Sequence, residues 1–212
     1  MGHMTNDSAF EDFFEPRMMT CPKVSLTDPQ IKLVRDFVAR LWQSKIAEYP
    51  WDAENIIDRN VIGRLCEYAL LAIYRKEAYF DDSIGKSTNY TTPDLWQSPR
   101  HKRQLPDPRI PADVKGSRFG NTPLIEKELK SVVIDGVRHL CPNIICVSDF
   151  RNVWFLGIAS PKVLKECSST SLIKNANNGK KTAFYGADKL VPVPKTWEEL
   201  QAVCTNLLEK GS

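Results

Sequence analysis

The sequence has no long apolar run and no glycine-rich nucleotide-binding motif. No stretch of about 18 apolar residues occurs in its 212 residues, which excludes a membrane-spanning helix. The N-terminus is acidic and interrupted rather than basic and then apolar, so no secretory signal is expected. Neither GxxxxGKS/T nor GxGxxG is present, so we do not expect a nucleotide-binding loop.

Close-set metal ligands of the zinc type are also missing. The chain has six cysteines and three histidines, and the cysteines form no CxxC pair. A structural zinc site needs four close-set ligands, and an iron–sulfur cluster needs four cysteines that meet in space. The scattered cysteines therefore favour reduced thiols, which are typical of an intracellular compartment such as the cytoplasm.

Length and composition suit one domain with a sizeable core. Hydrophobic residues make up 42% of the chain and charged residues 26%, with a net charge of +3. Residues 1–26 show no periodicity, so we expect a poorly ordered N-terminal arm before a single domain at 27–212. A nucleic-acid partner requires local basic surface rather than a large net charge.

The order of expected elements is helices first, then strands, then a helix. Thr27-Asp28-Pro29 is a helix start, and apolar residues continue at helical spacing to about Glu48. A second helix is expected from about 52 to 79, and a proline-rich basic loop from 81 to 111. Strands are expected at 112–114, 131–134, 143–147 and 153–158, helices at 161–166 and 197–208, and a polar surface loop at 168–181. This order favours an α/β (α+β) fold with a mixed central sheet flanked by helices.

The central chemical pattern is Pro93-Asp94, eighteen intervening residues, and Asp113-Val114-Lys115. Asp113 and Lys115 are two apart on an expected strand, so their side chains share one face. With a second carboxylate on a neighbouring strand, this set suits metal-assisted phosphodiester hydrolysis. Carboxylates hold Mg²⁺, and a lysine can orient water and stabilise charge on phosphate. The alternative is a surface strand of alternating charge.

Glu67 is a second candidate because it lies beside helix positions that should be buried. A carboxylate near a core face is costly unless it is paired or bound to metal. Gly63, one turn earlier, would allow another element to approach closely. The alternative for Glu67 is an ion pair with Arg64 or Arg75.

Several polar and aromatic residues are candidates for contact with nucleic acid. Gly116 and Gly120 would permit close backbone approach to a ligand. Trp96 and Phe119 could stack on bases or pack in the core, whereas Trp42 and Trp51 are expected to be packing residues. The candidates for phosphate contact are Ser117, Arg118, the cluster Arg100, Lys102 and Arg103, and the loop residues Lys180 and Lys181. The alternative in each case is an ordinary turn or a solvated loop.

Taken in order, these residues resemble the PD-(D/E)xK, or restriction-endonuclease-like, nucleases, over about residues 54–166. That superfamily has a helix with a G…ExA signature, then PD on one strand and (D/E)xK on the next. Asp113 stands where Glu is commoner. Asp107, also preceded by proline, is an alternative first ligand. Only five residues separate it from Asp113, a hairpin too short to align both carboxylates easily, so the spacing favours Asp94.

The resemblance implies a DNA nuclease that uses Mg²⁺, with Mn²⁺ as a substitute. Asp94, Asp113 and Glu67 would hold the metal, and Lys115 would be the catalytic lysine. The expected substrate is duplex DNA cut by an endonuclease that leaves a 5′-phosphate, and a homodimer would suit cleavage of both strands. Two alternatives remain, a catalytically inactive DNA-binding or assembly module on the same fold, and a nuclease directed at RNA.

Overall fold

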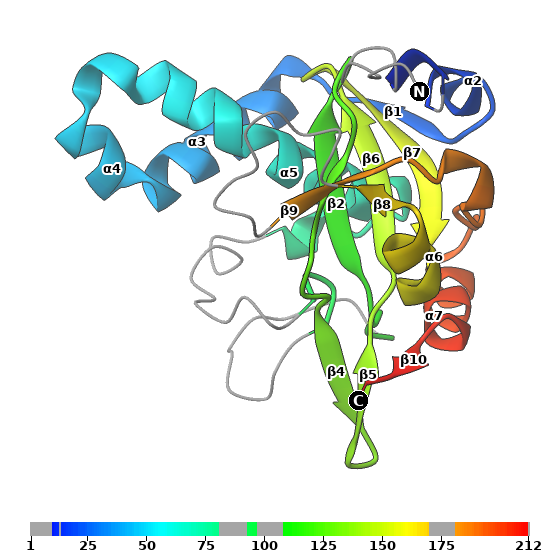
Figure 1. The fold of residues 1–212 in the computed structure, drawn as a ribbon. Coiled ribbons are helices and arrows are strands. Elements are labelled where there is room, and N and C mark those ends of the chain that lie inside the picture. The colour runs from blue at the N-terminus through cyan, green and yellow to red at the C-terminus, as the bar shows by residue number, and fades with distance from the viewer. Residues whose placement is uncertain (1–9, 13, 81–92, 97–107, 170–180, 212) are drawn as a thin grey trace.

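The computed structural model describes residues 10–12, 14–80, 93–96, 108–169 and 181–211. Four strands form the central sheet, in the order β1 (Lys23–Ser25), β7 (Asn152–Ala159), β6 (Asn143–Ser148) and β2 (Asp113–Arg118). β2 runs parallel to β6, whereas the other two pairs are antiparallel. The sheet is therefore mixed, and with its flanking helices the chain has the expected mixed α/β class (Figure 1).

Two small antiparallel sheets complete the strand structure. One contains β10 (Glu209–Lys210), β5 (Val137–Leu140) and β4 (Ser131–Ile134), and the other β3 (Leu124–Glu126), β9 (Lys181–Phe184) and β8 (Ser168–Ser169). The β4–β5 hairpin extends away from the central sheet in Figure 1 and turns at Asp135-Gly136, both with positive φ. Asp-Gly is a preferred pair for such two-residue turns.

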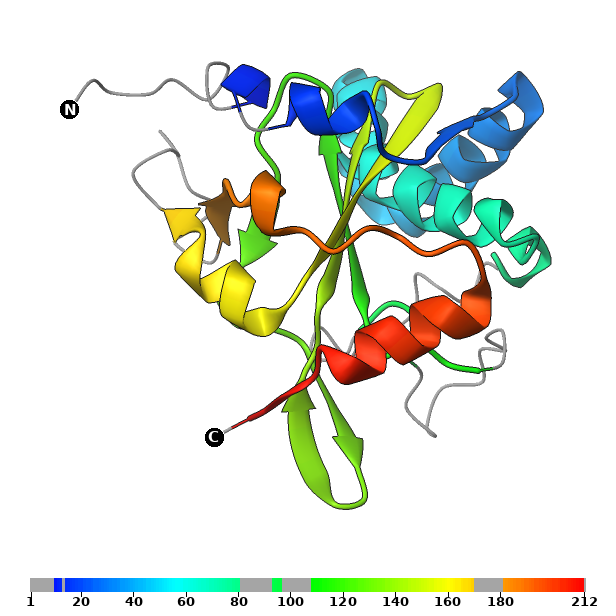
Figure 2. The ribbon, with the colours of Figure 1, turned by 90° about the vertical axis from the view of Figure 1, so that its right-hand side faces the viewer.

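The helices cover the sheet and lie at its ends. They are α2 (Glu15–Met18), α3 (Asp28–Leu41), α4 (Gln43–Glu48), α5 (Ala53–Ile73), α6 (Pro161–Glu166) and α7 (Trp197–Asn206), with 3-10 turns at Pro50–Asp52 (η1), Glu77–Tyr79 (η2) and Ala187–Lys189 (η5). Figure 2 shows α7 beside the end of α5, where the rings of Tyr74 and Trp197 are 5.5 Å apart. Across the described part of the chain, no helix has both the length and the apolar character needed to cross a membrane.

The expected helix boundaries differ from the observed ones at two places. The first helix is interrupted at Trp42, where the backbone leaves helical geometry, so α3 and α4 are separate. The second helix ends at Ile73 rather than near Tyr79, because Arg75 takes a left-handed conformation with φ of 56°. The strand expected at 112–114 extends to Arg118, since it pairs with β6 along its whole length.

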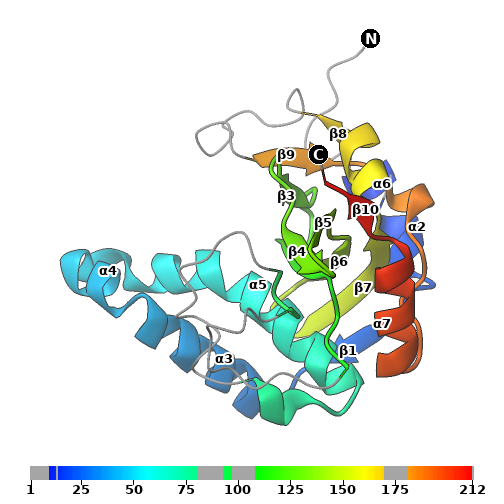
Figure 3. The same cartoon turned by 90° about the horizontal axis from the view of Figure 1, so that it is seen from below.

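Both faces of the sheet are buried, and β6 shows this most clearly because all six of its residues are buried. Ile144 and Cys146 face the core shared with α3, α5 and α7, whereas Ile145 and Val147 face the core shared with α6, η5 and β9. This alternation follows from the two-residue period of a strand. Figure 3 shows α3 and α5 on one side of the sheet and α6 on the other.

The described part of the expected N-terminal arm packs into the fold, unlike a poorly ordered lead-in. Phe10 and Phe14 are fully buried against the β9 side of the core, and β1 pairs with β7. The guanidinium of Arg17 donates hydrogen bonds of 2.9 Å to the carbonyl oxygens of Leu156 and Leu190. This segment shows no periodic pattern because these contacts involve isolated side chains rather than one regular face.

A close approach between α5 and β2 fixes the helix against the strand that carries the DxK pattern. A Cβ at Gly116 would stand 2.7 Å from Cys66 Sγ and 3.2 Å from Gly63 Cα. The absence of a side chain at Gly116 therefore serves helix–strand packing, in contrast to the expected approach to a ligand. The neighbouring Val114 also packs in the α5 core, so Asp113 and Lys115 face the opposite side.

Gly116→Ala is therefore expected to lower the free energy of unfolding by about 1–3 kcal/mol, because the added methyl overpacks this contact. Urea unfolding followed by circular dichroism measures the change. Adding Cys66→Ala removes the clashing Sγ and should recover part of the loss. Gly63→Ala is the matched control, since a Cβ there meets no atom within 4 Å. An equal loss in Gly63→Ala would contradict this account.

Candidate active site

Asp94 lies in a turn beside the start of β2 rather than on the neighbouring strand that its pattern predicts. The amide of Leu95 donates to Ala112 O at 3.3 Å, and the amide of Ile110 donates to Leu95 O at 3.2 Å. Through these bonds the turn lies against the segment that leads into β2. The amide of Asp94 then donates to Asp113 Oδ1 at 3.3 Å, and the amide of Val114 donates to Asp94 Oδ2 at 3.1 Å.

Lys115 completes the expected set on the same face of β2. Its Nζ lies 2.7 Å from Asp113 Oδ2 and 3.1 Å from Glu126 Oε2 on β3. The Asp113 side chain is 1% exposed and the Lys115 side chain 15% exposed. The structure thus brings together the three residues of the sequence pattern, Asp94, Asp113 and Lys115. Glu126 is an additional carboxylate that the pattern did not indicate.

Lys130 is a second site residue, besides Glu126, that the sequence pattern did not indicate. Its Nζ lies 2.6 Å from Asp113 Oδ1 and 3.3 Å from Asp94 Oδ1, so one ammonium bridges both carboxylates. The backbone holds it in place, because Cys141 N donates to Lys130 O at 2.9 Å. A single lysine before a strand has no distinguishing sequence pattern, so no signal in the chain would have identified it.

Burial and charge act against each other in this cluster. Burial raises the pKa of Asp113, and the Asp94 carboxylate adds to the rise, whereas Lys115 and Lys130 oppose it. Burial also disfavours the ionised form of Asp94, but the charge of Lys130 and the hydrogen bond with Asp113 help to hold the pKa of Asp94 below its ordinary value. Despite burial, the two carboxylates keep the pKa of Lys130 above its ordinary value, so it remains an ammonium.

Glu67 is not brought to the aspartate pair as a third ligand. Arg64 Nη1 donates to both of its carboxylate oxygens, at 2.7 and 2.6 Å, which is the ion pair given as the alternative. α5 packs on the face of β2 opposite to Asp113, and among the described residues Glu67 forms no metal-holding group with the two aspartates. Arg64 links the two groups electrostatically, because Glu67 raises its pKa most and Asp94 and Asp113 add to the rise.

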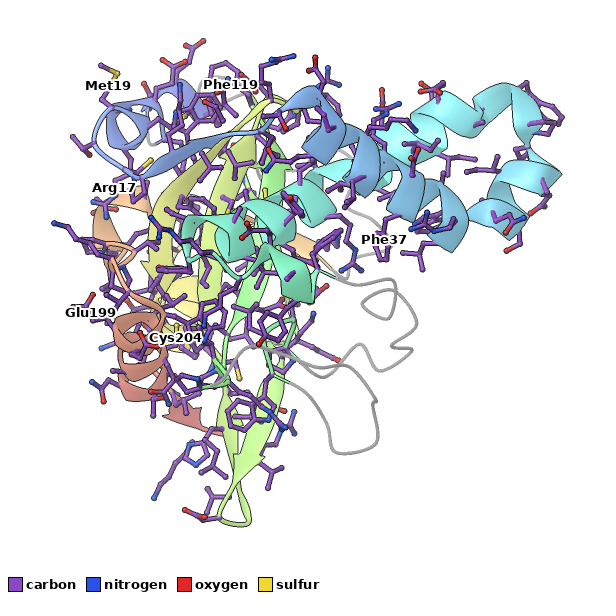
Figure 4. The ribbon with its side chains drawn as sticks, turned by 180° about the vertical axis from the view of Figure 1, so that it is seen from behind. Arg17, Met19, Phe37, Phe119, Glu199 and Cys204 are labelled. Carbon is purple, nitrogen blue, oxygen red and sulfur yellow. The ribbon has the colours of Figure 1, made fainter. Side chains whose placement is uncertain are left out.

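Ser117 and Arg118 lie towards the far end of β2, with Arg118 roughly 16 Å from Asp113 at strand spacing. Ser117 Oγ donates to Asn121 O at 2.8 Å, and the Arg118 guanidinium lies over the Phe150 ring at 5.2 Å. Phe119 packs against the rings of Phe10 and Trp154, and Figure 4 shows it near the N-terminal helical segment. Within the described residues, these side chains therefore contact other parts of the fold rather than the aspartate cluster.

The other expected phosphate contacts fall partly outside the described residues. The residues outside the described part of the chain are Arg100, Lys102, Arg103 and Lys180, together with the alternative ligand Asp107. Lys181 is described, at the start of β9, where its Cα pairs with that of Glu126. It therefore neighbours the carboxylate that contacts Lys115.

Two observations fit a divalent cation at the aspartate pair. Asp113 Oδ2 is buried and makes no hydrogen bond to the described residues, although Lys115 Nζ is within ion-pair distance. Oδ1 of each aspartate is already directed at one shared positive charge, the Lys130 ammonium. Among the described residues no group of three or more His, Cys, Asp or Glu could hold a metal. Magnesium is often held by only one or two carboxylates, with water and phosphate completing its shell.

Comparisons of the chain with models of protein families, with curated proteins and with solved structures give no match.

Proposed function

We propose that this chain is a metal-dependent nuclease that hydrolyses DNA phosphodiester bonds, and specifically an endonuclease. The observation that carries the proposal is the meeting of Asp94, Asp113 and Lys115 at one point of the fold. Eighteen residues separate the two aspartates in the sequence, yet Asp113 accepts a hydrogen bond from the Asp94 amide and Asp94 accepts one from the Val114 amide. Such a pair with a lysine beside it has the composition that metal-assisted phosphodiester hydrolysis needs.

The arrangement around the site supports a restriction-endonuclease-like core. A long helix, α5, carries Gly63 and Glu67 and packs on the strand β2, which carries Asp113 and Lys115. β2 is part of a mixed sheet with helices on both faces. The order of helix, first aspartate and DxK strand is the order that the resemblance requires.

Each side chain has a distinct task in the proposed reaction. Asp94 and Asp113 would hold Mg²⁺ or Mn²⁺, which when bound lowers the pKa of water and neutralises charge on the phosphate. Lys115 presents an ammonium that can orient the attacking water and stabilise developing charge. Glu126 and Asp113 position that ammonium from two sides. The water oxygen bonds to phosphorus, the bond to the 3′ oxygen breaks and that oxygen takes a proton, so a 5′-phosphate remains.

Digestion of supercoiled plasmid, linear duplex, single-stranded DNA and RNA, with Mg²⁺, Mn²⁺ or EDTA, tests the proposal. We expect nicking of DNA with either metal and none in EDTA, because the aspartate pair alone supplies no activated water. Cleavage of RNA alone would replace the proposal with an RNA-directed nuclease. Sedimentation of the protein with and without duplex tests the separate prediction of a homodimer.

A catalytically inactive DNA-binding or assembly module is the second candidate, and one observation favours it. Lys130 and Lys115 together neutralise Asp113, and Lys130 also pairs with Asp94. A buried network of ion pairs of this kind can serve structure alone. No cleavage of any nucleic acid in Mg²⁺ or Mn²⁺ would select this candidate.

A further inference from the structure

A groove of 680 Å³ opens between the α4–η1–α5 segment and the edge formed by β3 and β9. Its lining includes Trp42, Lys45 and Tyr49 around α4, Asn60 of α5, and Leu124 and Lys181 of β3 and β9. The volume lies within the range of about 300–1,000 Å³ that holds ligands of drug or nucleotide size. None of these residues belongs to the aspartate cluster, so the groove is a separate feature.

Although separate, the groove neighbours the aspartate site along the elements that line it. On the strand side, the Cα of Lys181 pairs with that of Glu126, whose carboxylate lies 3.1 Å from Lys115 Nζ. On the helix side, Arg64 follows Asn60 one turn later along α5. A ligand that fills the groove therefore extends towards the carboxylates.

The groove and its rim combine positive charge with aromatic rings. Lys45 Nζ lies 5.4 Å from the centre of the Tyr49 ring, and the Trp51 ring stands edge-on to Tyr49 at 5.8 Å. Trp51 is 80% exposed, contrary to the packing role that its sequence position predicted. Asp52 is the acidic residue of the lining, and it accepts a hydrogen bond of 2.8 Å from Asn55.

We propose that this groove binds one unpaired strand of DNA and leads it to the aspartate site. Lysines along a groove attract backbone phosphates, and exposed aromatic rings provide faces on which bases stack. A groove that holds drug-sized ligands admits a few nucleotides of one strand and not a paired helix. The inference rests on the proposed nuclease function and narrows its substrate to DNA with an unpaired stretch beside the cleaved bond.

The test is binding of a fluorescein-labelled oligothymidylate of about 12 nucleotides, within the site sizes of single-strand binding folds. Anisotropy is measured in EDTA, so binding is separated from cleavage, and a duplex of equal length is measured beside it. We expect the wild-type protein to prefer the single strand. Tyr49→Ala/Trp51→Ala should weaken that binding about tenfold or more, and Trp51→Phe alone should retain most of it because a stacking face remains.

Salt dependence provides the readout for the two lysines. Lys45→Ala/Lys181→Ala should reduce the slope of log affinity against log salt by about 1.4, or about 0.7 for each phosphate contact on a single strand. Lys162→Ala is the matched control, because this exposed lysine lies on α6, on the other face of the sheet. Unfolding midpoints of all variants show whether any loss reflects folding instead.

The inference is overturned if the groove variants bind the oligothymidylate as the wild type does, or if Lys162→Ala weakens binding equally. Preference of the wild type for the duplex overturns it as well. The proposed nuclease function fails independently, when groove variants lose binding but the wild type cleaves no DNA in Mg²⁺ or Mn²⁺. The two failures are therefore distinguishable in one set of samples.

Discussion

Supercoiled plasmid should remain intact with the Lys115→Ala variant in Mg²⁺, under conditions in which the wild-type protein nicks it. Lys115 supplies the only cation in contact with both Asp113 and Glu126 among the described residues. Removing a positive donor aimed at developing charge lowers catalytic rates by about 10²–10³-fold. Nicking rates measured on agarose gels over time give the ratio, and binding of the plasmid in EDTA should be spared.

A second variant distinguishes loss of catalysis from loss of folding. Lys115→Met keeps the aliphatic stem of a side chain that is 15% exposed, and it should lose activity to the same degree. Lys162→Ala, at an exposed lysine away from the site, should nick plasmid at the wild-type rate. Wild-type rates in a folded Lys115→Met protein would show that the active site lies elsewhere.

The Lys130→Met variant is expected to be less stable without metal and to bind Mg²⁺ more tightly. Lys130 is the cation that bridges Asp94 and Asp113, and Asp113 is fully buried. Removing one partner of a buried ion pair costs about 3–5 kcal/mol, and we expect about 3 because Lys115 remains. Two carboxylates that have lost their shared ammonium then attract a divalent cation more strongly.

Melting temperatures with and without Mg²⁺ measure both effects in one experiment. A ligand that binds only the folded state raises stability in proportion to the logarithm of its concentration over Kd, so Mg²⁺ should stabilise Lys130→Met more than the wild type. Lys127→Met, at an exposed lysine in the same loop, is the matched control and should behave as the wild type. Equal responses to Mg²⁺ in Lys130→Met and the wild type would rule out a metal at the aspartate pair.

Local patterns in the sequence were sufficient to predict the elements whose conformation depends on neighbouring residues. The helix at Pro161–Glu166 is found where it was expected, because Ser160 caps it and accepts a hydrogen bond from Val163 N. The hairpin of β6 and β7 follows from two buried apolar runs joined by a short turn. The shared face of Asp113 and Lys115 was predictable for the same reason, since alternation along a strand is a local property.

The tertiary structure alone decided which other groups meet at those two residues. Asp94 reaches Asp113 through backbone bonds of a turn, Lys130 comes from a loop, and Glu126 comes from a different sheet. Glu67, whose helix position suggested a ligand, instead forms an ion pair with Arg64. Contacts between distant segments have no periodic signature, because chain path and packing bring them together rather than the order of neighbouring residues.

The same distinction applies to the groove and to the N-terminal segment. Trp51 has a sequence position typical of packing, yet it lies in η1 with its ring exposed beside Tyr49. Phe10 and Phe14 lie in a segment without periodicity, yet both fill the core beyond β7. The sequence by itself determined which strand carries the DxK pattern and which faces of the helices are apolar. The positions of charges and rings around that strand were decided only by tertiary packing, since burial and pairing depend on segments far apart in the chain.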